Sequence, residues 1–317
     1  MIPKSGNWFP AFAKPASAGE GRSDKIMLKQ PDRLPKNSCD THLHVFGDAK
    51  TYPVGNPNAL YQPPRDCTFA AMTALHDAMG IDRAVLVQPT IYGTDHSLLH
   101  DVLKSAPRGK YRGVAIVDDS VSDAELARLH GVGVRGARFN FGGNFKLTPS
   151  MATLRRSLDR VRELGWFVKV FGFNDDFLAV EAELRKIRLP AIIDHMGGPD
   201  YRRGTSAPVI RLMLDLLKND NWWIGLSNGD LRSQTGETWD DVVAFGRLYY
   251  QAAPERCMWG TDWPHVHRFI HPPKDSHAGH GLDHEFKIVD LLERFVPDRA
   301  ARDRVLVDNP ARFFGFT

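Results

Sequence analysis

The chain has 317 residues, of which 42% are hydrophobic and 25% charged, and its formal net charge is +3. That length suits either two ordinary domains or one large α/β barrel. Basic residues are scattered among acidic ones, so the sequence lacks the concentrated positive surface expected of a nucleic-acid-binding protein. No apolar run approaches the ~20 residues that a membrane-spanning helix needs.

The N-terminal stretch and the cysteines are typical of a cytoplasmic protein. The first residues contain no continuous apolar segment of the kind found in a signal peptide. Cys39, Cys67 and Cys257 are too few and too far apart for a disulfide framework or a zinc site built on thiolates. We therefore expect a cytoplasmic protein, and the sequence leaves assembly into a homo-oligomer open.

Residues 1–37 contain proline, glycine, serine and lysine without clear periodicity, so we expect an extended N-terminal arm. From residue 38 onward, short β-rich runs alternate with amphipathic helical stretches, which predicts a single domain over 38–317. The predicted strands are 39–46, 82–89, 111–118, 132–141, 166–173, 189–197, 222–229 and 256–264. Two helical stretches, 285–296 and 302–315, follow the last strand.

Local signals support helices between these strands. Gly80 stands where a helix C-terminus favours glycine, and Ser122 and Glu125 have the spacing of a capping box. The alternation of strands and helices indicates parallel βαβ units. Their number, about eight, is that of a (β/α)8 TIM barrel. A doubly wound open sheet, which usually has fewer strands, is the alternative.

One glycine-rich stretch, GVGVRG at 131–136, matches the dinucleotide pattern G-x-G-x-x-G. That fingerprint requires a strand before it and a helix after it. Here a helical stretch precedes the glycines and a β-rich run follows them. We therefore expect no nucleotide cofactor.

Polar residues stand near the ends of several predicted strands, where a TIM barrel forms its active site. His42 and His44 are two positions apart, so both lie on one face of a strand. Both imidazoles enter the barrel if Leu43 faces the helices; two packed polar residues are the other interpretation. His195 and Asp262, on the sixth and eighth predicted strands, would meet them at one mouth.

Further candidates lie at the other strand ends. They are Gln88 and Thr90 after the second strand, Arg138 and Asn140 on the fourth, Arg232 after the seventh and His265 after the eighth. Each arginine could instead form a surface salt bridge. The histidine-rich stretch 265–284 is expected to be a loop over the mouth, with His265 contacting substrate, rather than a second metal site.

The H-x-H of His42 and His44, the later DHMGGP and the GTDWPH near the C-terminus resemble the amidohydrolase superfamily. More narrowly, they resemble its amidohydrolase-2 branch, which includes 2-pyrone-4,6-dicarboxylate lactonase, 4-sulfomuconolactone hydrolase, sugar-lactone hydrolases and aldarolactone isomerases. The resemblance extends from about Cys39 to the C-terminus and independently implies the TIM barrel. It implies that His42, His44, His195 and Asp262 are the catalytic residues.

The resemblance also raises the question of a metal. Binuclear members of the superfamily use a lysine or glutamate on the fourth strand and a histidine on the fifth. Here the fourth strand carries Arg138, whose permanently charged guanidinium cannot ligate a metal, and the fifth has Lys169, of unknown direction, but no histidine. We expect no two-metal site. A single zinc on His42, His44, His195 and Asp262 stays open, but we favour no metal cofactor.

We therefore expect a hydrolase that opens the lactone ring of a small carboxylate-bearing molecule. Asp262 would act as general base for the attacking water, although an aspartate there could instead cap a helix. The three histidines would polarise the carbonyl, directly or through zinc. Arg138 and Arg232 would bind the carboxylate, since a guanidinium matches it with two hydrogen bonds. Gln88, Thr90, Asn140 and His265 are further expected substrate contacts.

Three other functions fit the same residues. They are a lactone isomerase, a mononuclear zinc decarboxylase of an unsaturated or aromatic acid, and a binding protein without activity. Pyrone-dicarboxylate members of the family carry an arginine within the turn that here reads HMGGPD. Phe171 also stands near where a tyrosine would suit that substrate. These two differences argue against the pyrone dicarboxylate itself.

Overall fold

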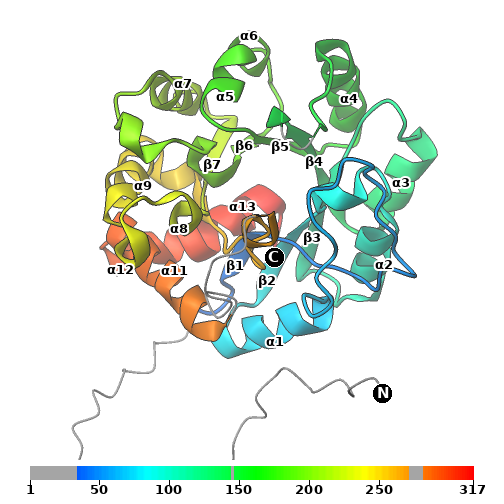
Figure 1. The fold of residues 1–317 in the computed structure, drawn as a ribbon, viewed down its shortest axis with the longest axis horizontal. Helices are drawn as coiled ribbons and strands as arrows, with labels where there is room; N and C mark the ends of the chain where they lie inside the picture. The colour runs from blue at the N-terminus through cyan, green and yellow to red at the C-terminus, as the bar shows by residue number, and fades with distance from the viewer. Residues whose placement is uncertain (1–33, 144–145, 271–280) are drawn as a thin grey trace, which may run out of the picture. The chain divides into compact units, whose positions relative to one another are not determined.

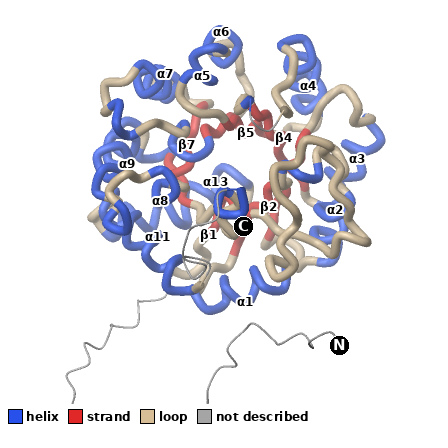
Figure 2. Tube along the Cα trace, viewed as in Figure 1, coloured by secondary structure: helices blue, strands red, loops and turns tan. Residues whose placement is uncertain are grey.

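The computed structural model describes residues 34–143, 146–270 and 281–317, so most of the expected arm and part of the histidine-rich stretch lie outside the described residues. Eight strands form one parallel sheet in the order β1 to β8. The strands are β1 Cys39–Leu43, β2 Arg83–Val87, β3 Tyr111–Ile116, β4 Val134–Asn140, β5 Phe167–Phe171, β6 Ala191–Ile193, β7 Trp222–Leu226 and β8 Cys257–Trp259. Helices surround them (Figures 1 and 2). The predicted (β/α)8 TIM barrel is confirmed.

Helices connect the successive strands and continue after β8. They are α1 Phe69–Met79, α2 Ser97–Ser105, α3 Asp123–Val132, α4 Met151–Glu163, α5 Asp175–Ala179, α6 Glu181–Leu184, α7 Pro208–Leu217, α8 Gly229–Arg232, α9 Asp240–Ala252, α10 His267–Ile270, α11 Leu282–Phe295, α12 Arg299–Asp303 and α13 Asn309–Phe314. The predicted caps are present: Gly80 ends α1 with φ 83°, and the Ser122 side chain accepts from Glu125 N at the start of α3. Within the described ranges, none of these helices has the length and apolarity to cross a bilayer.

Apolar side chains alternate between the two sides of the strands, as a barrel requires. Leu43 belongs to the larger cluster that joins the strands to the helices, so His42 and His44 do face inward. A second cluster fills the barrel interior, and it consists of Cys39, Val85, Val87, Val114, Phe167, Ile192, Trp223, Met258, Phe314 and Phe316. Phe314 and Phe316 lie beyond the strands in sequence, and α13 is seen across the ring of strands in Figure 1. They plug the barrel with apolar side chains.

All eight strands end earlier than predicted, and the differences are largest at β6 and β8, where they concern candidate site residues. β6 stops at Ile193 because residues 194–197 turn out of the sheet, and β8 stops at Trp259. His195 and Asp262 have φ of 53° and 61°, in the left-handed region that few residues other than glycine adopt. Such conformations are costly and are concentrated at functional sites.

Backbone hydrogen bonds join the segment after β8 to β1. Asp262 N donates to His42 O at 2.8 Å, and His44 N donates to Trp263 O at 2.7 Å. The Asp40 carboxylate accepts from Thr261 N at 3.0 Å, Thr261 Oγ1 at 2.5 Å and His42 N at 3.1 Å. These bonds fix His42, His44 and Asp262 relative to one another.

Gly260 lies where these two segments come closest. A Cβ at this position would stand 2.8 Å from His42 N and 3.2 Å from Asp40 Oδ1. We expect Gly260→Ala to lower the free energy of unfolding by about 1–3 kcal/mol. The resulting shift of Asp262 should lower kcat/KM by about tenfold or more, because small misplacements of reacting groups are costly.

Thermal unfolding and steady-state kinetics measure both effects. Gly131→Ala is the matched control, since a Cβ there meets nothing within 4 Å and alanine favours the helix. Equal behaviour of the two variants would contradict the role given to Gly260.

Candidate active site

A cavity of about 530 Å³ lies at the carboxyl ends of the strands. It is lined by His44, Leu60, Tyr61, Thr90, Arg138, Phe171, Phe173, Asn174, Asp200, Arg202, Asn228, Leu231, Arg232, Gln234, Asp262, Val266, His267 and Ile270. Its volume suits a small-molecule ligand, and its lining mixes apolar and charged side chains. Five of the predicted site residues line it: His44, Thr90, Arg138, Arg232 and Asp262.

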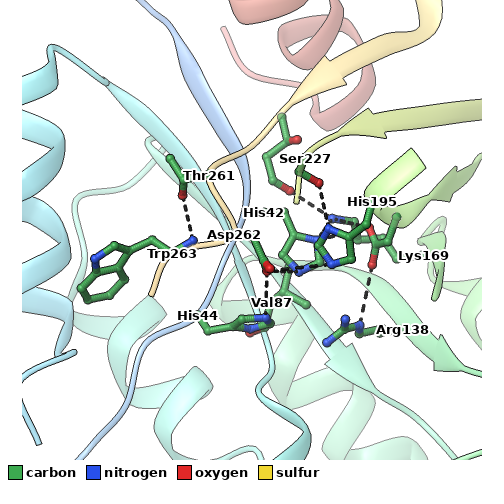
Figure 3. Close-up of polar contacts among 12 residues, drawn as sticks. His42, His44, Val87, Arg138, Lys169, His195, Ser227, Thr261, Asp262 and Trp263 are labelled. Atoms are coloured by element: carbon green, nitrogen blue, oxygen red, sulfur yellow. Dashed lines mark hydrogen bonds and ion pairs between the residues drawn. The ribbon is translucent and has the colours of Figure 1, made fainter. Parts of the chain in front are cut away.

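The predicted cluster of histidines and aspartate is assembled next to this cavity (Figure 3). The Nε2 atoms of His42, His44 and His195 lie 3.6, 3.6 and 3.8 Å from Asp262 Oδ1. All four residues are buried. Only His44 and Asp262 are among the residues that line the cavity, so His42 and His195 lie behind the carboxylate that they contact.

Hydrogen bonds at the far side of each ring orient two of the imidazoles. His44 Nδ1 lies 2.8 Å from Val87 O, and His195 Nδ1 lies 2.9 Å from Ser227 Oγ. Because a carbonyl oxygen only accepts, His44 must donate from Nδ1, and its neutral form therefore has a lone pair on Nε2. That lone pair is directed toward Asp262.

The cluster keeps Asp262 ionised and two of the imidazoles neutral. Burial would raise the pKa of Asp262, but His195, His44 and His42 outweigh it and hold that pKa well below its usual range. Burial, and then the charge of Lys169, lowers the pKa of His42. Burial also lowers the pKa of His195, against the opposing effect of Asp262. At neutral pH the aspartate can therefore accept a proton.

Two buried residues of the site, Lys169 and Asp194, are absent from the predicted set. Lys169 projects inward from the middle of β5, with Nζ 2.9 Å from His42 Nδ1 and 3.0 Å from Asp194 Oδ1. Its place between Val168 and Val170, which face the helices, could have indicated an inward direction. Asp194 leaves the strand at the turn after β6, which alternation does not predict.

Arg138 and Arg232 are held beside a pair of phenylalanines. The Arg138 guanidinium stands 5.0 Å from the centre of the Phe171 ring, and that of Arg232 stands 4.6 Å from the Phe173 ring. The one ion pair that Arg138 forms within the described residues is with Asp194, 3.7 Å from Nε. Arg138 is 5% exposed. A buried, weakly paired guanidinium at a cavity is suited to binding an anion.

Three predicted substrate contacts lie elsewhere. The Gln88 amide donates to Gly93 O at 3.0 Å and Asp95 O at 2.7 Å and thereby holds its own loop. Asn140 lines a second cavity of about 310 Å³ that shares Arg138 with the first. His265 is fully buried, with Nε2 2.8 Å from Glu285 Oε1. Gln88, Asn140 and His265 are thus outside the lining of the main cavity.

The described ends of the histidine-rich stretch meet α8 and α11. Asp230, His265 and His284 lie close enough together to share a metal ion. However, Arg268 NH2 is 3.1 Å from His284 Nε2 and 3.7 Å from Asp230 Oδ2. A guanidinium in this position already supplies the positive charge that a metal would bring, so the cluster fits an ion-pair network better.

The spacing of the main cluster, in contrast, fits a single metal ion. Tetrahedral zinc with ligands at 2.0–2.1 Å holds them about 3.4 Å apart. The observed separations of 3.6–3.8 Å between Nε2 atoms and Asp262 Oδ1 are close to this. Within the described residues, His42 Nε2 and Asp262 Oδ1 also lack hydrogen-bond partners. By position, His42, His44 and Asp262 could share one divalent ion, whereas His195 groups with His42 and Asp194 instead.

Comparison with known proteins shows the family. Residues 39–316 match the model of the amidohydrolase family, Amidohydro_2. The chain belongs to this family. It is 33% identical to a 2-pyrone-4,6-dicarboxylate hydrolase of Comamonas testosteroni, over 98% of the chain and 97% of the relative. It is 34% identical to a 4-sulfomuconolactone hydrolase of Rhizobium radiobacter, over 89% and 91%.

A third relative acts differently on lactones. The chain is 28% identical to a D-galactarolactone isomerase of Agrobacterium fabrum, over 89% of the chain and 92% of the relative. Among solved structures, an apo protein of Agrobacterium tumefaciens superposes with a TM-score of 0.75 at 26% identity, over 90% of this chain and 98% of that one. This amidohydrolase is thus an enzyme of the hydrolase type, and its relatives are lactone hydrolases or isomerases.

The buried histidines should titrate at widely separated pH values. Burial would lower the pKa of His265, but the ion pair with Glu285 raises it to about 9. His42 and His195, in contrast, should stay neutral to below ~6.5. The ion pair of His265 therefore stabilises the fold fully below ~6.5, and this contribution is lost as pH rises through about 9.

NMR titration of the histidine ring protons measures these midpoints. In Glu285→Gln the midpoint of His265 should fall to below ~6.5, because burial then dominates. A common midpoint for all three buried histidines would refute this electrostatic picture.

Proposed function

We propose that this amidohydrolase hydrolyses the lactone ring of a small molecule that carries at least one carboxylate, with Asp262 as general base. The observation that carries the proposal is the position of Asp262, which contacts three histidines and lines a cavity that is also lined by Arg138 and Arg232. The carboxylate can activate water, and the guanidiniums can bind the anionic part of a substrate. The lactone-processing relatives support the same reaction class.

The reaction begins with a water molecule between Asp262 and His44. The lone pair of His44 Nε2 and the Asp262 carboxylate can each accept one of its protons, which directs the water oxygen toward the lactone carbonyl. As the C–O bond forms, one water proton passes to Asp262. The ring C–O bond then breaks, and the leaving oxygen takes that proton, which gives a carboxylic acid and a hydroxyl or enol. The acid releases the second water proton to solvent and becomes a carboxylate.

The low pKa of Asp262 suits the second half of this cycle. A carboxylate that is strongly stabilised as an anion is a weak base, but once protonated it is a strong acid. It therefore returns the proton readily to the leaving oxygen. Arg138, at 5% exposure and beside the same cavity, would stabilise the negative charge that develops on the carbonyl oxygen.

His42 and His195 act on the base in this proposal. Their Nε2 atoms contact Asp262 Oδ1 but do not line the cavity, so they orient the carboxylate rather than touch substrate. A divalent ion, when bound to His42, His44 and Asp262, would supply a Lewis acid for the carbonyl. We favour the reaction without a metal, since Arg138 and Lys169 already bring positive charge to the inner faces of β4 and β5.

A panel of carboxylated lactones, screened with protein of measured metal content, tests the function. Hydrolysis in H₂¹⁸O places one labelled oxygen in the product carboxylate, whereas an isomerase, the activity of one relative, incorporates none. Release of CO₂ that is lost on chelation would instead support the zinc decarboxylase. If no acidic lactone in the panel turns over, the binding-protein interpretation gains and the lactonase proposal fails.

Asp262→Asn removes the proposed base at nearly constant shape. We expect kcat to fall by about 10²–10⁴-fold, the usual contribution of a general base, with little change in KM. Stopped-flow and steady-state assays on the best lactone measure this. Asp159→Asn, on the exposed face of α4, is the control and should keep the wild-type rate. An Asp262→Asn enzyme of undiminished kcat would exclude Asp262 as base.

Arg138→Met and Arg232→Met test the carboxylate contacts. Each should raise KM for the acidic lactone by about 10–100-fold, because a charge-assisted hydrogen bond contributes about 1.5–3 kcal/mol. The methyl ester of the same lactone lacks the charge and provides the matched substrate. If the variants weaken binding of ester and acid equally, these arginines have a structural role only.

A further inference from the structure

Lys169 is the one buried cation that contacts an imidazole of the cluster in the described part of the chain. It lies on β5 with 2% of its surface exposed, and its Nζ atom reaches across the barrel to β1. There it is 3.1 Å from Thr41 O and 2.9 Å from His42 Nδ1. The third neighbour is Asp194 Oδ1 at 3.0 Å. Figure 3 shows Lys169 beside the His42 ring.

These three contacts account for the three protons of an ammonium group. Thr41 O and Asp194 Oδ1 can only accept, and each takes one proton. The third proton is directed to His42 Nδ1, which must then offer a lone pair. A neutral imidazole has one N–H, so the proton of His42 stands on Nε2.

The opposite arrangement is less favourable. A proton on His42 Nδ1 could be donated to Asp194 Oδ1 at 3.2 Å, but it would then face an ammonium proton at the 2.9 Å contact. Removing the proton from Lys169 would relieve that clash only by taking the close cation away from Asp194, which is 1% exposed. Asp194 would then keep Arg138, at 3.7 Å, and a buried carboxylate that loses its nearer cation is destabilised.

We propose that Lys169 is a positioning residue that fixes the proton of His42 on Nε2, so that an N–H rather than a lone pair faces the Asp262 carboxylate. Nε2 is 3.6 Å from Asp262 Oδ1 and has no other partner within the described residues. A protonated Nε2 has no lone pair for a metal ion. The catalytic part of this inference rests on the proposed function, while the protonation state does not.

At this cluster, the spacing of the side chains and the tautomer of His42 have opposite consequences for metal binding. His42, His44 and Asp262 have the separations of a metal site, and His44 has its lone pair on the inner side. His42 has the wrong tautomer for a ligand as long as the ammonium faces Nδ1. Lys169 thus excludes a metal from a geometry that would otherwise accept one.

Two measurements on the full chain test the inference. In ¹⁵N-histidine NMR spectra, His42 should be the Nε2–H tautomer in the wild type and become Nδ1–H in Lys169→Met, where Asp194 is the remaining acceptor. After chelator treatment and addition of Co²⁺, the wild type should hold less than about 0.2 ion per chain, and Lys169→Met should approach one.

Matched variants separate this effect from a general loss of charge. Lys186 is 64% exposed at its side chain, so Lys186→Met should behave as wild type in both measurements. Lys169→Arg keeps a cation with N–H donors and should keep the metal out. In the wild type, an Nδ1–H tautomer or a tightly held stoichiometric ion overturns the proposal, and the wild-type spectrum decides even if Lys169→Met does not fold.

Activity supplies a third, independent measure. Loss of the N–H that faces and orients Asp262 should lower kcat of metal-free Lys169→Met by about 10–100-fold and leave KM nearly unchanged. Lactone hydrolysis by a wild type that holds a stoichiometric metal would support the proposed function and refute the role of Lys169. The predicted tautomer without any lactone turnover would do the reverse.

Discussion

The site depends on the hydrogen bonds between β1 and the segment after β8. Asp262 N donates to His42 O, and His44 N donates to Trp263 O. The Asp40 carboxylate accepts hydrogen bonds from both segments. Neither segment alone has the base and its histidines together. The left-handed backbone of Asp262 is held by this pairing, and the conformational cost is offset by bonds formed around it. Barrel closure and assembly of the site are therefore one event.

The charged side chains of the site surround two buried carboxylates, Asp194 and Asp262, in different ways. Asp194 is buried between Lys169 and Arg138, and it compensates much of their charge. Asp262 is surrounded by imidazoles and contacts no arginine or lysine within the described residues. The cavity beside it is lined by arginines, of which Arg202 is already paired with Asp200. An incoming anion is therefore attracted by Arg138 and Arg232 and repelled by Asp262, which favours a substrate with its carboxylate on the arginine side.

The alternation of strands and helices was sufficient to predict the barrel, and the H-x-H spacing placed His42 and His44 correctly, because side-chain direction in a strand has a fixed period. That period failed where strands end early. His195 and Asp262 stand in turns whose shape depends on glycines and on tertiary bonds. Their place near the ends of predicted strands brought them into the set, and the family motifs supported it, but alternation could not give their direction. Gln88 and Asn140 show the remaining difficulty: a polar residue at a strand end can serve its own loop or a neighbouring cavity. For Lys169, the alternation with Val168 and Val170 was the available signal, which the prediction did not take into account.

The apolar plug has a consequence for how the chain acquires its structure. Phe314 and Phe316 complete the barrel interior, and Arg112 on β3 donates to Phe314 O and Gly315 O. These partners are separated by about two hundred positions, so the loop that must be closed is long. During synthesis, the inner faces of all eight strands are made before the residues that cover them. A nascent barrel therefore exposes Val85, Phe167 and Trp223 until the C-terminal segment leaves the ribosome, and in that interval it is most vulnerable to aggregation.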